Sequence, residues 1–285
     1  MIKLLILNNF IHHKNKEGLI HILNLLNYEY KIGTIDDIEN YDIVYSPSAP
    51  VDIQKYPHKK FIFGPHFSVF PDHNIKDILN NPNYIYIFPS TWTKDMWTYL
   101  TKNSLRCKVF SFPVNMSIFK PIDTNIKDKV LIYYKRRNPA DLEYLKDFLR
   151  TRGVEYTIFN YLARYSESDY LDCLQRAKYM IVLDAHESQG FALEEAMSCN
   201  VPLLVWNVKT LNQEYRSRYP PFPATTIPYW SETCGEAFTE KEQFESTYEK
   251  FISNLETYSP RKFIEDNLSV EKCANNFVEL IRFEE

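Results

Sequence analysis

The sequence predicts an α/β protein with two domains, each built on a parallel sheet layered with helices. Three observations support this. The chain has 285 residues, which exceeds the usual size of one domain. Short apolar runs alternate along it with helical patterns or polar loops, as in parallel sheets whose faces are covered. A polar stretch without periodicity, residues 115–129, interrupts this alternation once and is the expected linker.

Six apolar runs in the first half are expected to be strands, because each is short and ends at polar, proline or glycine residues. They cover residues 2–7, 30–35, 43–45, 61–63, 84–88 and 108–112. Gly18 opens a helical pattern that continues to Leu26, with apolar residues three and four apart. A second helix is expected around residues 93–100.

The second half shows the same alternation of strands and helices. Strands are expected at residues 130–134, 154–159, 179–183 and 201–206, with a last short strand at 226–228. Helices are expected at 139–151, which starts with a favourable proline, at 168–177, after Gly190, and in several segments beyond 241. We therefore expect domains at residues 1–118 and 119–262, and a C-terminal helical segment, 263–285, that packs back toward the first domain.

Bulk composition excludes several classes of protein. The net charge of -4 gives no reason to expect a nucleic acid or an anionic membrane as partner. The five cysteines are scattered without a CxxC pair, which indicates reduced thiols and neither a disulfide framework nor a zinc site. The apolar run 2–7 is too short for a signal peptide, and no run approaches the length of a membrane span. We expect a soluble, cytoplasmic protein.

The stretch 184–197 is the most informative part of the chain. It lies between two apolar runs and begins as a polar loop that leads into a helical pattern, so it reads as the loop at the carboxyl end of a strand in a βαβ unit. Glu187 falls in the loop and Glu195 in the helix. Taken alone, two such glutamates are more often solvated than functional.

Two further features support a functional role for this stretch. Lys135, Arg136 and Arg137 close a strand, where their charge and bidentate bonding suit a diphosphate. Gly190, at the start of a helix in the same half, would offer backbone N–H groups to the same anion. His66 follows a strand beside a glycine, which distinguishes it from the other six histidines, although a lone histidine is more often structural. The sequence contains no GxSxG, GxGxxG, Walker or DxD motif.

These residues resemble a known family. Residues 187–202, ESQGFALEEAMSCNVP, are similar to the E-x7-E region of retaining GT-B glycosyltransferases of the family 4 type. Residues 113–121, PVNMSIFKP, resemble the segment that precedes the second domain in that family. FPSTW at 88–92 and GPH at 64–66 resemble a strand end and the first-domain histidine region.

The resemblance implies a metal-independent enzyme of two Rossmann-like domains whose sheets face an interdomain cleft. It would transfer a sugar, most simply a hexose, from a UDP- or GDP-sugar with retention of configuration, and would need no cofactor besides this donor substrate. His66 and Glu187 would be catalytic, with Glu187 on the sugar hydroxyls and Glu195 on the ribose. The donor site would further include Lys135, Arg137, Ser188, Gln189, Gly190 and Phe191, with residues 160–164 near the base. Strand alternation would place Lys135 and Arg137 on one face, and Arg136 is the alternative cation.

The sequence also departs from the family pattern. Residues 8–16 replace its first-domain glycine-rich loop, Gln189 replaces a phenylalanine, and Asn200 stands where glycine is common. The expected acceptor is a glycan, a protein or a small molecule. Two alternatives stay open: a nucleotide-sugar epimerase or glycosyl phosphorylase on the same architecture, and a non-catalytic relative that binds nucleotide sugars.

Overall fold

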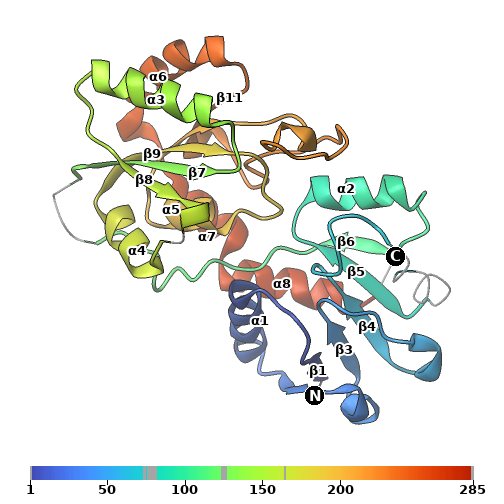
Figure 1. Ribbon diagram of the computed structural model, residues 1–285. Helices are drawn as coiled ribbons and strands as arrows, with labels where there is room; N and C mark the ends of the chain where they lie inside the picture. Colours follow the sequence, from blue (N-terminus) through green and yellow to red (C-terminus); the bar gives the residue numbers. More distant parts are fainter. Residues whose placement is uncertain (1, 73–74, 76–81, 123–126, 164, 284–285) are drawn as a thin grey trace. The chain divides into compact units, whose positions relative to one another are not determined.

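The computed structural model describes residues 2–72, 75, 82–122, 127–163 and 165–283. Contacts divide the chain into two compact units, Met1–Pro113 with Leu268–Glu285, and Val114–Asn267. The boundaries expected after residues 118 and 262 lie near these division points. Each unit consists of one parallel sheet covered by helices, so the predicted fold class is confirmed (Figure 1).

The sheet of the first unit has six parallel strands in the order β2-β1-β3-β4-β5-β6. The strands are β1 (Lys3–Leu7), β2 (Glu29–Gly33), β3 (Ile43–Ser46), β4 (Lys60–Phe63), β5 (Tyr84–Phe88) and β6 (Cys107–Val109). Its α-helices are α1 (His13–Leu25), α2 (Thr91–Leu100) and α8 (Val270–Leu280). Helix α1 begins at His13 rather than at Gly18, so part of the expected loop forms its first turn.

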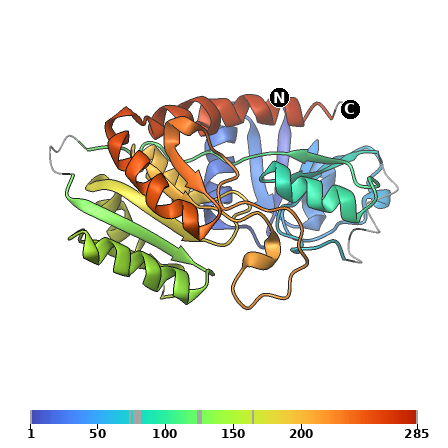
Figure 2. The same ribbon diagram turned by 90° about the horizontal axis from the view of Figure 1, so that it is seen from above.

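Helices cover both faces of this sheet (Figures 1 and 2). Side chains alternate along β5. Tyr86 therefore faces α2, where its ring stacks on Trp97 with centroids 5.0 Å apart. Ile87 faces the opposite way, toward Leu19 of α1 and Phe277 of α8. The C-terminal helix thus completes the hydrophobic layer of the first unit, although it is the last helix in the sequence.

Tyr45 on β3 contributes a buried hydroxyl to the apolar layer beneath α1 and α8. Within the described part of the chain this hydroxyl has no hydrogen-bond partner. A buried, unsatisfied polar group destabilises the folded state. We expect Tyr45→Phe to raise the free energy of unfolding by about 1 kcal/mol in urea titrations.

A matched variant gives the opposite sign. The hydroxyls of Tyr179 and Tyr248 lie 2.9 Å apart and hydrogen-bond each other. Tyr179→Phe leaves the Tyr248 hydroxyl without this bond and should lower the free energy of unfolding by about 1 kcal/mol. Equal effects of the two changes would show that the Tyr45 hydroxyl is satisfied.

The second unit has five parallel strands in the order β11-β10-β9-β7-β8. They are β7 (Lys129–Lys135), β8 (Thr157–Asn160), β9 (Ala177–Asp184), β10 (Leu203–Trp206) and β11 (Gly235–Phe238). The α-helices are α3 (Pro139–Thr151), α4 (Glu167–Gln175), α5 (Phe191–Ser198), α6 (Phe244–Ser253) and α7 (Pro260–Leu268). None of the helices within the described ranges is long and apolar enough to cross a membrane.

The last strand of this sheet is not where we expected it. Residues 226–228 form no strand, and β11 takes the edge position instead. The hydroxyl of Thr226 donates to the carbonyl oxygens of Asp184 and Ala185, at 3.2 and 3.0 Å. Its N–H donates to the side chain of Asn207. These bonds link Thr226 to the residues that end β9 and follow β10. Such long-range contacts cannot be predicted from a short apolar run.

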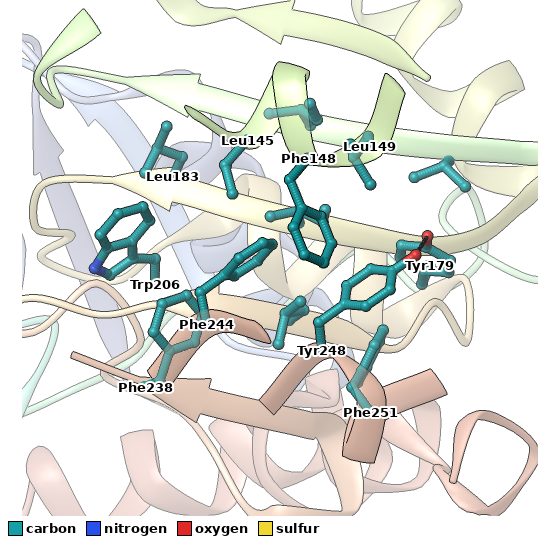
Figure 3. Close-up of a cluster of buried hydrophobic side chains, with 14 of the residues drawn as sticks. Leu145, Phe148, Leu149, Tyr179, Leu183, Trp206, Phe238, Phe244, Tyr248 and Phe251 are labelled. Carbon is teal, nitrogen blue, oxygen red and sulfur yellow. Dashed lines mark hydrogen bonds between the residues drawn. The ribbon is translucent and has the colours of Figure 1, made fainter. Parts of the chain in front are cut away.

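Aromatic side chains form the core between this sheet and helices α3 and α6 (Figure 3). The ring of Phe148 from α3 lies 4.6 Å from Phe244 and 5.0 Å from Tyr248, both from α6. Trp206 at the end of β10 packs on Phe238 of β11, with ring centroids 5.4 Å apart. This core holds the carboxyl ends of the strands in fixed positions, which matters for the residues that follow them.

Candidate functional site

The two sheets share one strand order, and that order defines where a ligand would bind. In chain order, the first five strands of each unit are arranged second, first, third, fourth, fifth. Loops after the first and third strands therefore leave in opposite directions, which opens a crevice at the carboxyl ends. In the second unit this switch point lies between β7 and β9, where Lys135 and Asp184 are paired in register.

Charged side chains meet at this switch point. The ammonium of Lys135, the last residue of β7, forms an ion pair with Glu187 in the loop after β9. The Lys135 Nζ lies 4.0 Å from Asp184 Oδ2. The side chains of Lys135 and Glu187 are only 12% and 14% exposed, and that of Asp184 is fully buried. The structure thus brings together Lys135 and Glu187, two residues that the sequence placed in one site.

Burial and charge oppose each other in this cluster. Burial alone would lower the pKa of Lys135, but the charge of Glu187, together with the nearby Asp184 carboxyl group, outweighs it and keeps the pKa above its ordinary value. Burial would likewise raise the pKa of Glu187, but the Lys135 charge holds it below its ordinary value. Lys135 and Glu187 are therefore both charged at neutral pH and form an ion pair. An anionic ligand that binds Lys135 has to compete with Glu187 for the ammonium group.

Helix α5 starts beside this ion pair. Gly190 precedes the helix in the left-handed conformation, with φ = 96°. A Cβ at this position would lie 3.4 Å from the Cβ of Glu187, so the turn is packed closely against the glutamate. The first N–H groups of a helix have no acceptor within it, and here Phe191 begins the helix. Ser188 is exposed in the same turn.

Gln189 and Glu195 turn inward from this helix start. The Gln189 amide donates to Glu194 at 3.0 Å, and both side chains are buried. Glu195 is only 3% exposed, and its charge raises the pKa values of Tyr165 and Tyr170 after the larger effect of their burial. Glu187 in the loop and Glu195 in the helix are both largely shielded from solvent, so the alternative that these two glutamates are merely solvated is wrong for this fold.

An aromatic cluster extends from the ion pair toward β8. The Lys135 Nζ lies 4.5 Å from the ring centroid of Tyr161, which is 45% exposed. Tyr165 contacts the rings of Phe159 and Tyr170, at 5.2 Å from each. Phe159 and Tyr165 flank the segment 160–164, which contains Tyr161 and which the resemblance places near the base. Arg164 itself lies outside the described residues.

The other two cations of the predicted cluster lie elsewhere. Strand alternation was expected to place Lys135 and Arg137 on one face, but β7 ends at Lys135 and Arg136 has a left-handed φ of 52°. That reason for a shared face is therefore wrong. The guanidinium of Arg137 is buried and bonds to oxygens of Trp206, Asp184 and Asp141, at 2.9, 3.3 and 3.3 Å. Arg136 is exposed and pairs with Glu214.

His66 lies in the first unit, just after β4. Its Nε2 lies 3.4 Å from the backbone N–H of His12 and 3.1 Å from the side-chain amide of Asn15. A backbone N–H can only donate, so Nε2 accepts and the proton of the neutral ring is on Nδ1. Burial, and to a smaller extent His12, lower the pKa of His66 to about 4. At neutral pH the ring is an uncharged hydrogen-bond donor through Nδ1.

This protonation state can be measured directly. We expect an NMR titration of His66 to give a midpoint near pH 4, with nitrogen shifts that report the Nδ1–H tautomer at pH 7. The resonance is assigned by its absence in His66→Gln. Asn15→Leu removes one donor to Nε2 and should increase the population of the other tautomer. A midpoint near the ordinary value of about 6.5 would contradict the account.

Comparisons with solved structures identify the architecture. Anabaena HepE in complex with UDP aligns with a TM-score of 0.62 over 99% of this chain and 100% of that chain, at 12% identity. The lipopolysaccharide outer core galactosyltransferase WaaB gives 0.60, over 99% of each chain, at 13% identity. The sucrose-phosphate synthase of Thermosynechococcus elongatus gives 0.58, over 99% and 98%, at 9% identity. The chain has the GT-B fold.

Comparisons of the sequence, unlike those of the structure, found no similar protein. No protein-family model matches the chain, and no curated protein matches it in sequence. Within the described residues, no group of three or more His, Cys, Asp and Glu side chains is placed to hold a metal ion.

Two residues of this GT-B chain were not singled out by the sequence. Asp184 was read only as the first residue of the polar loop after a strand, and Tyr161 as part of another loop. A charged residue directly after an apolar strand is a signal that could have marked Asp184. No comparable signal marks Tyr161, because its contact with Lys135 joins the ends of two neighbouring strands.

Proposed function

We propose that this protein is a retaining, metal-independent glycosyltransferase of the family 4 type that moves a hexosyl group from a UDP- or GDP-sugar to an acceptor. The observation that carries the proposal is the buried Lys135–Glu187 ion pair beside the start of α5, at the topological switch point of the second sheet. The GT-B fold supports it, as does the UDP in the structure of the similar HepE.

Each residue has a role that follows from its chemistry. Lys135 and the first N–H groups of α5 would bind the diphosphate, because both are donors at a site that largely excludes water. Glu187 would accept hydrogen bonds from hydroxyls of the donor sugar. Glu195 would bond the ribose, and Tyr161 would lie near the base. Arg137 would hold the strand ends in place, since its donors bond to oxygens of the chain itself.

Catalysis would depend on stabilising the leaving diphosphate. Negative charge develops on the phosphate oxygen as the glycosidic bond to the donor breaks, and fixed donors aimed at that oxygen lower the barrier. Lys135 and the α5 N–H groups would supply this stabilisation. His66, neutral with its proton on Nδ1, would donate a hydrogen bond to the transferred sugar rather than a proton to the leaving group.

A thermal-shift screen with UDP-, GDP-, CMP- and dTDP-sugars tests the proposal. A ligand at a hundredfold excess over its Kd stabilises the folded state by about 2.7 kcal/mol, so a donor should raise the melting temperature by several degrees. The same donors are then incubated without acceptor. Conversion of the sugar would indicate an epimerase, whereas binding without hydrolysis or transfer to any acceptor would favour a non-catalytic relative. Absence of binding to every nucleotide sugar would contradict the proposal.

A further inference from the structure

Asp184, the last residue of β9, has an unusual environment for an acid. Its side chain is fully buried, and Oδ1 accepts the N–H of Ala185 at 2.6 Å. The other carboxyl oxygen, Oδ2, lies 4.0 Å from the Lys135 ammonium. This oxygen is buried and has no hydrogen-bond partner within the described residues, and the charge of Glu187 acts on the same carboxyl group. Two acids and one lysine thus share a site that is largely shielded from solvent.

Two acids beside one lysine favour a proton on one of them. Lys135 makes its direct ion pair with Glu187, so a charged Asp184 would leave Oδ2 buried without a donor of its own. A carboxylate is only an acceptor, so the two carboxyl groups can hydrogen-bond only if one of them carries a proton. Glu187 makes the direct ion pair with Lys135 and keeps a small exposed fraction, whereas Asp184 is fully buried. The proton therefore belongs to Asp184. Lys135 and Glu187 then cancel, and the buried cluster has no net charge.

The groups around Asp184 support the same assignment. Burial raises the pKa of Asp184 well above its ordinary value, and the Glu187 charge raises it further. The titratable and charged groups that face this cluster come from three segments: Tyr133, Lys135 and Arg137 from β7 and its turn, His186 and Glu187 from the loop after β9, and Glu214. The two nearby cations, Lys135 and Arg137, bond directly to Glu187 and to Asp141, and Lys135 lies 4.0 Å from the Asp184 oxygen.

We propose that Asp184 is a positioning residue that stays protonated at neutral pH and donates a hydrogen bond to Glu187, which orients the glutamate for the donor sugar. The role of Glu187 rests on the function proposed above. The Asp184 proton occupies one acceptor site of Glu187 and fixes the rotation of its carboxylate. The remaining acceptor sites then point in a defined direction, toward Lys135 and the start of α5.

Infrared spectroscopy tests the proton without any substrate. The wild-type protein at pH 7 should show the C=O stretch of a protonated, buried carboxyl group, and Asp184→Asn should lack this band. Glu187→Gln keeps the Asp184 carboxyl and should shift the band without removing it. A wild-type spectrum without such a band, or a band that persists in Asp184→Asn, would overturn the proposal.

Kinetics with the donor found in the screen test the positioning role. Asp184→Leu removes the hydrogen bond and should raise KM for the donor about tenfold. Asp184→Asn is isosteric and can donate to Glu187 from its amide while accepting from Ala185, so it should recover most of that loss. If Asp184→Leu does not fold, the pH profiles of the wild type and Asp184→Asn still test the positioning role.

The pH profile separates positioning from simple packing. As pH rises, Asp184 loses its proton, the hydrogen bond breaks and two carboxylates repel each other, so kcat/KM of the wild type should fall at alkaline pH. Asp184→Asn cannot lose this proton and should lack that fall. Identical profiles would overturn the positioning role. An infrared band without binding of any nucleotide sugar would leave the shared proton established and contradict the proposed function instead.

Discussion

Glu187→Gln is expected to lower the rate of sugar transfer by two to three orders of magnitude, the size of effect seen when one fixed polar contact to a transition state is lost. The amide keeps the volume of the side chain but loses the charge and half of the acceptor capacity. In the free protein, this charge is also the partner of Lys135. The variant therefore separates two effects that act in opposite directions.

The second effect concerns binding of the nucleoside diphosphate without its sugar. The diphosphate must compete with Glu187 for the Lys135 ammonium, so Glu187→Gln should bind UDP or GDP at least as tightly as the wild type does. Isothermal titration calorimetry measures this affinity, and a transfer assay measures the rate. A variant that loses nucleotide affinity and transfer together would show that Glu187 contacts the nucleotide or supports the fold, and not the sugar alone.

Lys135→Met should lower the affinity for the nucleoside diphosphate about 10- to 100-fold, because it removes a charge-assisted hydrogen bond in a buried site. Methionine retains most of the apolar stem of lysine, so the loss reports the charge. The change also leaves Glu187 buried without its cation, which costs stability. Unfolding curves should therefore accompany the titrations, and a lower pH, which protonates Glu187, should restore part of the stability.

The neighbouring residue provides a matched control. Arg136→Met removes one positive charge a single position further along, but Arg136 is exposed and faces Glu214. Its effect on nucleotide affinity should be less than threefold, the range of a surface ion pair. If Arg136→Met weakened binding more than Lys135→Met, the phosphate contact would belong to Arg136.

The combined variant completes the test. In Lys135→Met with Glu187→Gln, neither member of the ion pair is charged, so the stability lost in the single lysine variant should be largely recovered. Nucleotide affinity should stay low, because the cation is absent. Recovery of affinity in the double variant would mean that Lys135 acts only by neutralising Glu187.

Most of the secondary structure could be predicted because local patterns determine it. Strands β1, β5 and β7 were placed within one residue or two, since each is an apolar run between polar residues. Helix α3 was placed at its observed bounds, because Pro139 favours the first turn. Strand β11 was missed: Gly235–Phe238 has only two apolar side chains and pairs with β10 alone. An edge strand of this kind is defined by its neighbour rather than by its own residues.

The conformation of two residues explains further differences. Asn200 replaces the glycine that is common in the similar family, and it adopts φ = 59° after helix α5. Asparagine tolerates this left-handed conformation better than most residues, so the substitution keeps the turn. Arg136 adopts φ = 52° as well, and there the reversal ends the alternation that was expected to continue from Lys135 to Arg137.

By itself the sequence determined that this is a two-part α/β chain and that Glu187 and Lys135 follow strands of the same half, since periodicity and the ends of apolar runs are local properties. Only the tertiary structure decided which polar groups meet. Strand order and register place Lys135 opposite Asp184, turn Glu187 onto the lysine and direct Arg137 toward backbone oxygens. These contacts join residues about 50 to 70 positions apart, and their energies depend on burial, which a sequence pattern does not specify.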